Sequence, residues 1–191
     1  NLPGQFVGVW GASAGGVDIS LLVALILPAV TYYLLLRLNP DFTLTPSLAE
    51  SFAHPTPTTW VYTIRDGVSF HDGTTLTAAD VVASLSRHLD PAVGSSWYSV
   101  YQNVASIEQT GDREVTVTMN TPDSQFNLSM GGSAGVIESA ATLKEKGADY
   151  GNSTGGVNCT GPFELTEWTS GESITLDRFD DYWDEALRAR S

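Results

Sequence analysis

Residues 60–74 read WVYTIRDGVSFHDGT, and this stretch decides how the main sheet of the chain is built. From 59 to 65, aromatic and β-branched residues alternate with one another, which is typical of a strand with one buried face. The Asp66-Gly67 pair is a tight-turn signal, so we expect Val68 to Phe70 to pair back onto that strand. His71-Asp72-Gly73 marks a second turn. The stretch therefore predicts antiparallel β-structure closed by two turns.

A helix is predicted immediately after the second turn. Thr77 is a good N-cap, and Asp80, three residues later, is placed to complete a capping box. The apolar residues expected on one face of this helix are Val81, Val82, Leu85 and Leu89. Arg87 and His88 fall in its last turn, where positive charge suits the helix dipole. Asp90-Pro91 then ends the helix.

The rest of the chain predicts further strands and short helices. We expect a strand at 5–10, a loop at 39–46, and hairpins at 104–119 and 163–179 with turns at Gly111-Asp112 and Ser170-Gly171. Short helices are expected at 124–130 and 138–146. The fold class that follows is α+β, with mixed sheets, β-hairpins and short helices.

Composition limits the kinds of partner. The chain has 191 residues, of which 42% are hydrophobic, enough to bury a real core. It has 22 acidic residues against 9 basic ones, a net charge of −13. Such a chain has no basic surface with which to neutralise phosphates, so no nucleic acid partner is expected. The balance favours a soluble extracellular or salt-adapted protein.

The cysteine and histidine content predicts no metal site and no cofactor. Cys159 is the one cysteine, so the chain cannot form an internal disulfide or a cysteine-based zinc site. The histidines at 54, 71 and 88 lack metal-ligand spacing. The acidic cluster at 177–185 lacks the glycine and the final glutamate of an EF-hand loop.

An uncharged, mostly apolar segment runs from 19 to 36 and reaches the lower length limit of a membrane span. Pro28 lies in its middle, and three residues that follow Pro28, Thr31, Tyr32 and Tyr33, make the segment less apolar. A buried pair of short elements that is broken at the proline is therefore favoured over a membrane helix. No cationic signal peptide opens the chain, which fits a mature form or one that starts after a leader.

Several motifs occur in a fixed order along most of the chain. They are PSLAES at 46–51, the run at 60–74, LTAADVV at 76–82, TGPF at 160–163, and a closing group of Gly171, Leu176, Asp177 and DYW at 181–183. In this order they resemble the family 5 extracellular solute-binding proteins, which comprise the dipeptide, oligopeptide and nickel binders. Because the motifs are independent of one another, the ordered set is stronger evidence for the family than any single motif.

The resemblance implies a two-lobed periplasmic-binding-protein fold of type II, of which this chain holds a fragment of the N-terminal lobe. Residues 1–45 would start the first lobe, 46–158 would form a small subdomain with the signature hairpin and helix, and 159–191 would return to the first lobe before the second begins.

By the same resemblance, the protein is the solute-binding component of an ABC importer and not an enzyme. It would capture peptides or a related small solute between its lobes and deliver it to a membrane permease. It would be a periplasmic or extracellular lipoprotein, tethered through a lipid anchor upstream of this chain.

Two small-residue loops are predicted to contact the ligand. In the family, the loop after the first strand lies at the cleft, where small side chains allow a peptide backbone to approach main-chain groups closely. The residues of that loop are Gly11, Ala12, Ser13 and Ala14. The second loop, 131–135, matches a cleft-facing stretch of the family, and its predicted ligand residues are Ser133 and Ala134.

Trp97, Tyr98 and Tyr101 form an aromatic cluster that we expect in a loop. Such a cluster is suited to stacking on a ligand or lining an apolar pocket. Packing of the subdomain is an equally good explanation of the same residues.

The alternative hypothesis is that the chain is an enzyme. Residues 11–15 fit the G-x-S-x-G pattern, and they follow a predicted strand, as in serine esterases of the α/β-hydrolase type. Ser13 would be the nucleophile, His71 or His88 the base, and Glu50 or Asp66 the acid. Only ten residues precede the motif, so no oxyanion loop of the HGGG type is present before it.

Overall fold

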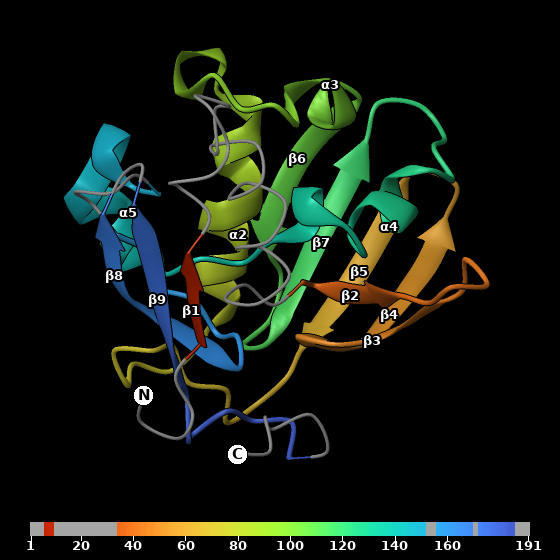
Figure 1. Ribbon diagram of the computed structural model, residues 1–191. Helices are drawn as coiled ribbons and strands as arrows, with labels where there is room; N and C mark the ends of the chain where they lie inside the picture. The colour runs from red at the N-terminus through yellow and green to blue at the C-terminus, as the bar shows by residue number, and fades with distance from the viewer. Residues whose placement is uncertain (1–5, 10–33, 152–155, 170–171, 186–191) are drawn as a thin grey trace.

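Three sheets and several short helices make up the part of the protein that the structure describes (Figure 1). The computed structural model describes residues 6–9, 34–151, 156–169 and 172–185. The strands are β1 (Phe6–Val9), β2 (Leu36–Leu38), β3 (Leu44–Pro46), β4 (Ala49–Thr56), β5 (Thr59–Ile64), β6 (Val104–Gln109), β7 (Glu114–Met119), β8 (Phe163–Thr169) and β9 (Ser173–Arg178). Their orders in the sheets are β1-β9-β8, β2-β3 and β4-β5-β7-β6.

The helices are short. They are α2 (Ala78–Ser86), α3 (Tyr98–Tyr101), α4 (Phe126–Ser129) and α5 (Ala140–Lys146), with 3-10 turns η1 (Arg87–Leu89), η2 (Pro91–Val93), η3 (Ser133–Gly135) and η4 (Gly147–Asp149). The predicted α+β class is therefore confirmed. Each strand pairing within the described residues is antiparallel.

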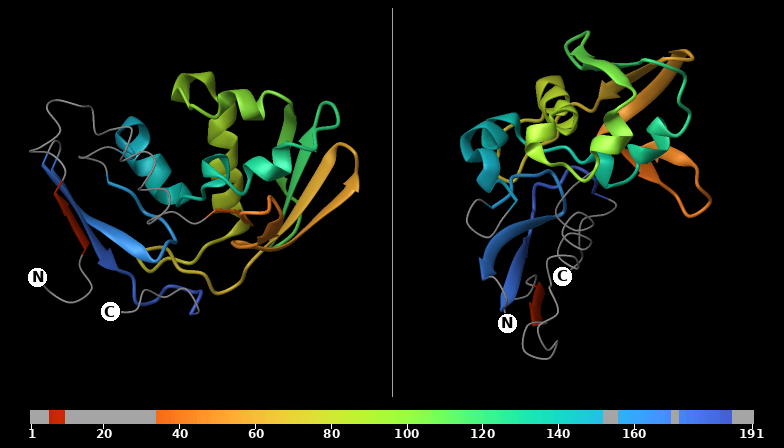
Figure 2. Two further views of the ribbon diagram at one scale, coloured as in Figure 1. Left: turned by 45° about the vertical axis from the view of Figure 1, so that its right-hand side comes forward. Right: turned by 90° about the horizontal axis from the view of Figure 1, so that it is seen from above.

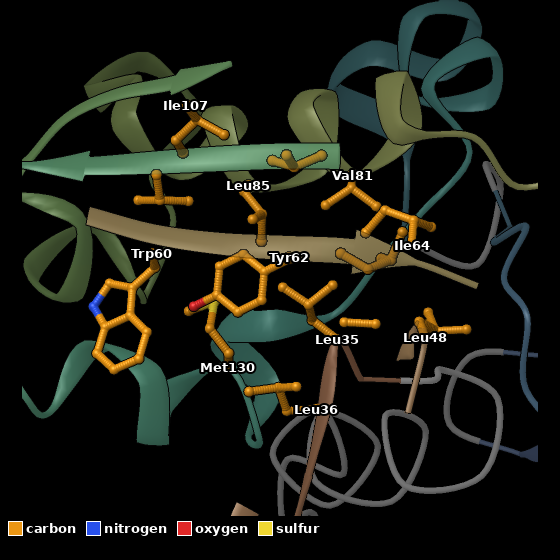
Figure 3. Packing of buried hydrophobic residues seen from close by; sticks show 14 of the residues in the cluster. Leu35, Leu36, Leu48, Trp60, Tyr62, Ile64, Val81, Leu85, Ile107 and Met130 are labelled. Atoms are coloured by element: carbon orange, nitrogen blue, oxygen red, sulfur yellow. The ribbon is translucent and has the colours of Figure 1, made fainter. Parts of the chain in front are cut away.

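The inner face of β5 organises the core. Trp60, Tyr62 and Ile64 alternate with half-buried residues and are themselves buried, as the sequence predicts. Figure 3 shows Leu85 of α2 and Met130 in the cluster that packs around them. The alternation of period two on the strand therefore determines which face of the sheet receives the helices.

The prediction that Val68 to Phe70 pair back onto β5 is wrong. The neighbours of β5 are β4 and β7. The segment instead pairs forward across the turn at 71–73, where Phe70 N donates to Thr74 O at 2.8 Å and Leu76 N donates to Val68 O at 2.9 Å. β4 takes the place beside β5, although most of its side chains are exposed and it contains Pro55, features that suit an edge strand.

Helix α2 begins as the sequence predicts. The Asp80 carboxylate accepts hydrogen bonds from Thr77 N at 2.9 Å and from Thr77 Oγ1 at 2.6 Å. Its other oxygen accepts from Ala140 N at 2.9 Å, so the same side chain also holds the start of α5. At the far end, Asp90 caps η2 by accepting from Ala92 N at 2.8 Å.

The region predicted as a loop at 39–46 is partly a hairpin, since β3 pairs with β2. Of the apolar segment 19–36, the structure describes the last three residues, and Leu35 and Leu36 are fully buried. Their N–H groups donate to Gly135 O at 2.8 Å and to Met130 O at 3.1 Å. Within the described ranges, no helix is both long and apolar enough to cross a membrane.

The three-stranded and four-stranded sheets lie on opposite sides of α2 (Figures 1 and 2). The turn at 71–73 joins them, because His71 N donates to Cys159 O at 2.9 Å and Asn158 Nδ2 donates to Asp72 Oδ2 at 2.8 Å. The His71 ring also bonds Gly161 O through Nε2 at 3.0 Å. Cys159 is completely buried in this junction.

Gly135 provides a test of how tightly the 130–136 segment is packed. A Cβ added there would lie 2.7 Å from Met130 Cα and 2.8 Å from the Met130 carbonyl carbon, so backbone would have to move. We expect Gly135→Ala to lower the free energy of unfolding by about 2 kcal/mol, as overpacking does. Gly132→Ala is the matched control, since its Cβ would meet its nearest atom, Ser129 O, at 3.6 Å. Urea unfolding of both variants measures the difference, and equal midpoints would contradict the prediction.

Candidate functional site

The predicted aromatic cluster lies in and before helix α3, so its expected placement in a loop is wrong for residues 98–101. Trp97 and Tyr98 are 39% and 36% exposed, whereas Tyr101 is 0% exposed. The cluster therefore divides into two aromatic rings at the surface and one in the core.

Tyr101 links α3 to the second predicted loop. Its hydroxyl donates to Ala134 O at 2.6 Å and lies 3.8 Å from Met130 Sδ. The ring stands edge-on to Phe126 of α4 with 5.6 Å between centroids. Burial raises the pKa of the Tyr101 hydroxyl, so it remains a hydrogen-bond donor. The structure thus brings together the aromatic segment and the loop that holds Ser133 and Ala134.

Hydrogen bonds to backbone carbonyls hold the small-residue loop at 131–135 in place. The carbonyls of Met130, Ala134 and Gly135 accept from Leu36 N, Tyr101 Oη and Leu35 N, respectively. Ala134 is 1% exposed, while Ser133 is half-buried and reaches the surface. Of the two residues predicted to bind ligand here, Ser133 is the accessible one, and Ala134 supports the backbone beneath it.

The other predicted loop, Gly11 to Ala14, lies outside the described residues. The structure locates what comes before and after it in the chain. β1 pairs with β9 in the three-stranded sheet, and Leu34 forms a bridge with Val136 beside the 131–135 loop. A contact between residues 11–14 and a ligand stays a prediction.

His88 has a role that the sequence did not suggest. Its Nδ1 lies 2.6 Å from Ser95 Oγ, and its ring lies 4.9 Å from the ring of Tyr101. Burial, and secondarily the charge of Arg87, lowers the pKa of His88 to about 4. The imidazole is therefore neutral at physiological pH. The expectation that His88 supplies positive charge to the last turn of the helix is therefore wrong, because α2 ends at Ser86 and the ring is neutral.

The residues named for an esterase are engaged elsewhere. Glu50 forms an ion pair with Arg113 at 3.0 Å, and Asp66 accepts from the N–H of Gly67. Among the described residues, neither carboxylate forms an ion pair with His71 or His88. Burial lowers the pKa of His71, whose Nε2 bonds a backbone carbonyl. Ser13 lies outside the described residues.

The described ranges contain no group of three His, Cys, Asp or Glu side chains that could hold a metal ion. One acid with a mostly covered side chain, 13% exposed, lies just beyond the small-residue loop. Glu138 pairs with Arg87 at 3.3 Å, and its backbone N and O both bond Ser84 Oγ. Burial raises the pKa of Glu138 to about 7, with the Arg87 charge opposing that rise.

Comparisons with known proteins agree with the motif order. Residues 43–189 match the model of the bacterial extracellular solute-binding proteins, family 5 Middle. The chain is 32% identical over 157 residues to the glutathione-binding protein GsiB of Escherichia coli O1:K1 / APEC, an alignment that spans 82% of this chain and 30% of GsiB.

Solved structures show the same fold. AgaA from A. tumefaciens R10, in complex with agropinic acid, has a TM-score of 0.74 and 32% identity over 82% of this chain and 31% of its own. AppA from Bacillus subtilis, in complex with a nonapeptide, has a TM-score of 0.70 and 25% identity over 94% of this chain and 35% of its own. The predicted partial type II periplasmic-binding-protein fold is confirmed. The chain spans about a third of the length of the relatives it matches.

The raised pKa of Glu138 predicts a pH dependence of stability. A carboxyl whose pKa is raised on folding contributes its full stabilisation at pH values below its pKa in the unfolded state. That contribution is lost as the pH rises through the folded-state pKa of about 7. We expect Glu138→Gln to remove a fall of about 3 kcal/mol in the free energy of unfolding between pH 4.5 and 8.5. Arg87 stays 5.6 Å from the Tyr150 ring and is partly exposed, so it is not left as a buried unpaired charge. Urea unfolding across this range measures the slopes, and parallel curves would refute the assignment.

Proposed function

Because the chain belongs to the bacterial extracellular solute-binding proteins of family 5, we propose that it is part of the solute-binding component of an ABC importer. The protein captures a peptide or a related small solute and passes it to a membrane permease. The observation that carries this proposal is the family match across residues 43–189. The match to GsiB and the structural match to AgaA, each at 32% identity, support it.

The proposed ligand surface on this chain combines the exposed and supporting residues of α3 and η3. Trp97 and Tyr98 offer ring faces for stacking, and Ser133 offers a hydroxyl and main-chain groups. Tyr101 and Ala134 act beneath them, since their hydrogen bond joins the two segments. The main-chain groups of Gly11, Ala12, Ser13 and Ala14 would complete the surface.

We propose that capture works by lobe closure. A ligand that contacts both lobes stabilises the closed form over the open form by its differential affinity for the two. A half-site that is already held by buried hydrogen bonds loses little conformational entropy when the ligand arrives. In this scheme 1–45 and 159–191 belong to the first lobe and 46–158 to a small subdomain, and the second lobe corresponds to part of the relatives' length that this chain does not span.

The proposed location is periplasmic or extracellular, as expected for this family. A lipid anchor upstream of the chain would hold the protein near its permease. The net charge of −13 suits a solute receptor that has no nucleic acid partner. The proposal involves no catalytic step and no cofactor.

The names of the relatives guide the choice of ligand panel. GsiB is a glutathione-binding protein, AgaA was solved with agropinic acid, and AppA was solved with a nonapeptide. Isothermal titration calorimetry of the protein in its native length should show binding of a member of a panel that contains glutathione, peptides of graded length and agropinic acid. Failure of the entire panel to bind would refute the proposal.

We expect Trp97→Ala to weaken binding of that ligand about tenfold, because a lost aromatic stack is worth about 1 kcal/mol or slightly more. Phe42→Ala is the matched control. Phe42 is 77% exposed but lies in the turn between β2 and β3, away from α3. Equal losses in the two variants would remove Trp97 from the ligand surface.

A further inference from the structure

The hydroxyl of Ser95 connects two parts of the protein. Ser95 Oγ lies 2.6 Å from His88 Nδ1 in η1 and accepts the N–H of Trp97 at 3.1 Å. Both contacts involve one oxygen, so the position of the Trp97 backbone depends directly on that of the His88 ring. The contact with His88 is part-buried, which reduces competition from water for it, whereas the bond from Trp97 N is exposed.

Local hydrogen bonds shape the segment that carries the exposed rings. Asp90 caps η2, and Gly94, with φ of 65°, turns the chain in a conformation that favours glycine. Tyr98 N then donates to Ser95 O at 3.1 Å, which leads into α3. These bonds all lie within 90–98, so they set the shape of the segment but not its position on the protein.

Two contacts supply that position, one through Tyr101 at the end of α3 and the other through the His88 ring. The His88 ring packs on Tyr101 at 4.9 Å between centroids, and Tyr101 bonds Ala134 O. A continuous path of contacts therefore runs from Trp97 through Ser95, His88 and Tyr101 to the loop that contains Ser133.

The chemistry of the pair suits a permanent link. A neutral imidazole has one nitrogen that accepts and one that donates, and a hydroxyl can accept one hydrogen bond while sharing its hydrogen in another. Burial keeps His88 neutral at physiological pH. The Ser95 hydroxyl can then donate its hydrogen to His88 Nδ1 while its oxygen accepts the N–H of Trp97.

We propose that His88 and Ser95 are positioning residues, which hold the exposed rings of Trp97 and Tyr98 in register with the Ser133 loop. The ligand-facing role of those rings rests on the proposed function, but the positioning itself does not. Neither His88 nor Ser95 needs to touch the solute.

The first experiment measures positioning without a ligand. Acrylamide quenching of Trp97 fluorescence is obtained by subtracting the signal of the matching Trp97→Phe protein. Ser95→Ala should raise the Trp97 quenching constant about twofold, because the loss of one hydrogen bond releases the segment. Ser95→Thr, which keeps a hydroxyl, should restore the native value. Ser99→Ala is the matched control, since Ser99 is an exposed serine of α3.

His88 is tested in the same assay by a pair of variants. His88→Asn places an amide oxygen near the position of Nδ1 and should keep quenching near the native value, whereas His88→Leu should raise it as Ser95→Ala does. An unchanged quenching constant in both Ser95→Ala and His88→Leu overturns the proposal. Thermal unfolding of each variant shows whether it is folded, and only folded variants are compared.

The second experiment measures affinity for glutathione and for a nonapeptide by calorimetry. If either binds the native protein, Ser95→Ala should weaken it about fivefold, and Ser95→Thr should recover the affinity. Binding that is unaffected by Ser95→Ala overturns the positioning role for the ligand surface. If neither probe binds but quenching responds as expected, the positioning stands and the choice of ligand class falls.

Discussion

The inner face of β5 must be covered, and the rest of the protein is arranged to cover it. Tyr62 illustrates the constraint, because it is fully buried and its hydroxyl would be costly to bury without a partner. The hydroxyl donates to Asn127 Oδ1 at 2.9 Å, which fixes α4 over the sheet. Leu35 and Leu36 enter the same cluster from the start of β2. One strand therefore determines the placement of α2, α4 and the β2–β3 hairpin.

Sequence reasoning succeeded where the signal is local. The capping box of α2, the alternation in β5, and the hairpin with its turn at Gly111-Asp112 each depend on residues a few positions apart, and each is present. It failed where the partner is distant. β4 has mostly exposed side chains and a proline, so nothing within it indicates that it would displace residues 68–70 beside β5.

The candidate site shows the same difference between features with a local signal and features that depend on a distant partner. Trp97 and Tyr98 are at the surface, as a binding role requires, and aromatic composition was enough to select them. The burial of Tyr101 was not predictable, because its partner, the carbonyl of Ala134, lies 33 positions away in the chain. The His88–Ser95 contact was missed for a different reason. Both residue types are common at helix ends and in turns, and only the loop geometry of 90–97 brings them together.

The burial of Cys159 has a practical meaning. The thiol is fully enclosed where the turn at 71–73 meets the segment that leads into the three-stranded sheet. An alkylating reagent can reach the thiol only in molecules where its surroundings, which include the Tyr150 hydroxyl at 3.6 Å, have opened, so its modification rate reports local opening at this junction. Because the chain has one cysteine, the signal comes from this junction alone. The alkylation rate of Cys159 can therefore serve as a probe of opening at the place where the two halves of the fold are joined.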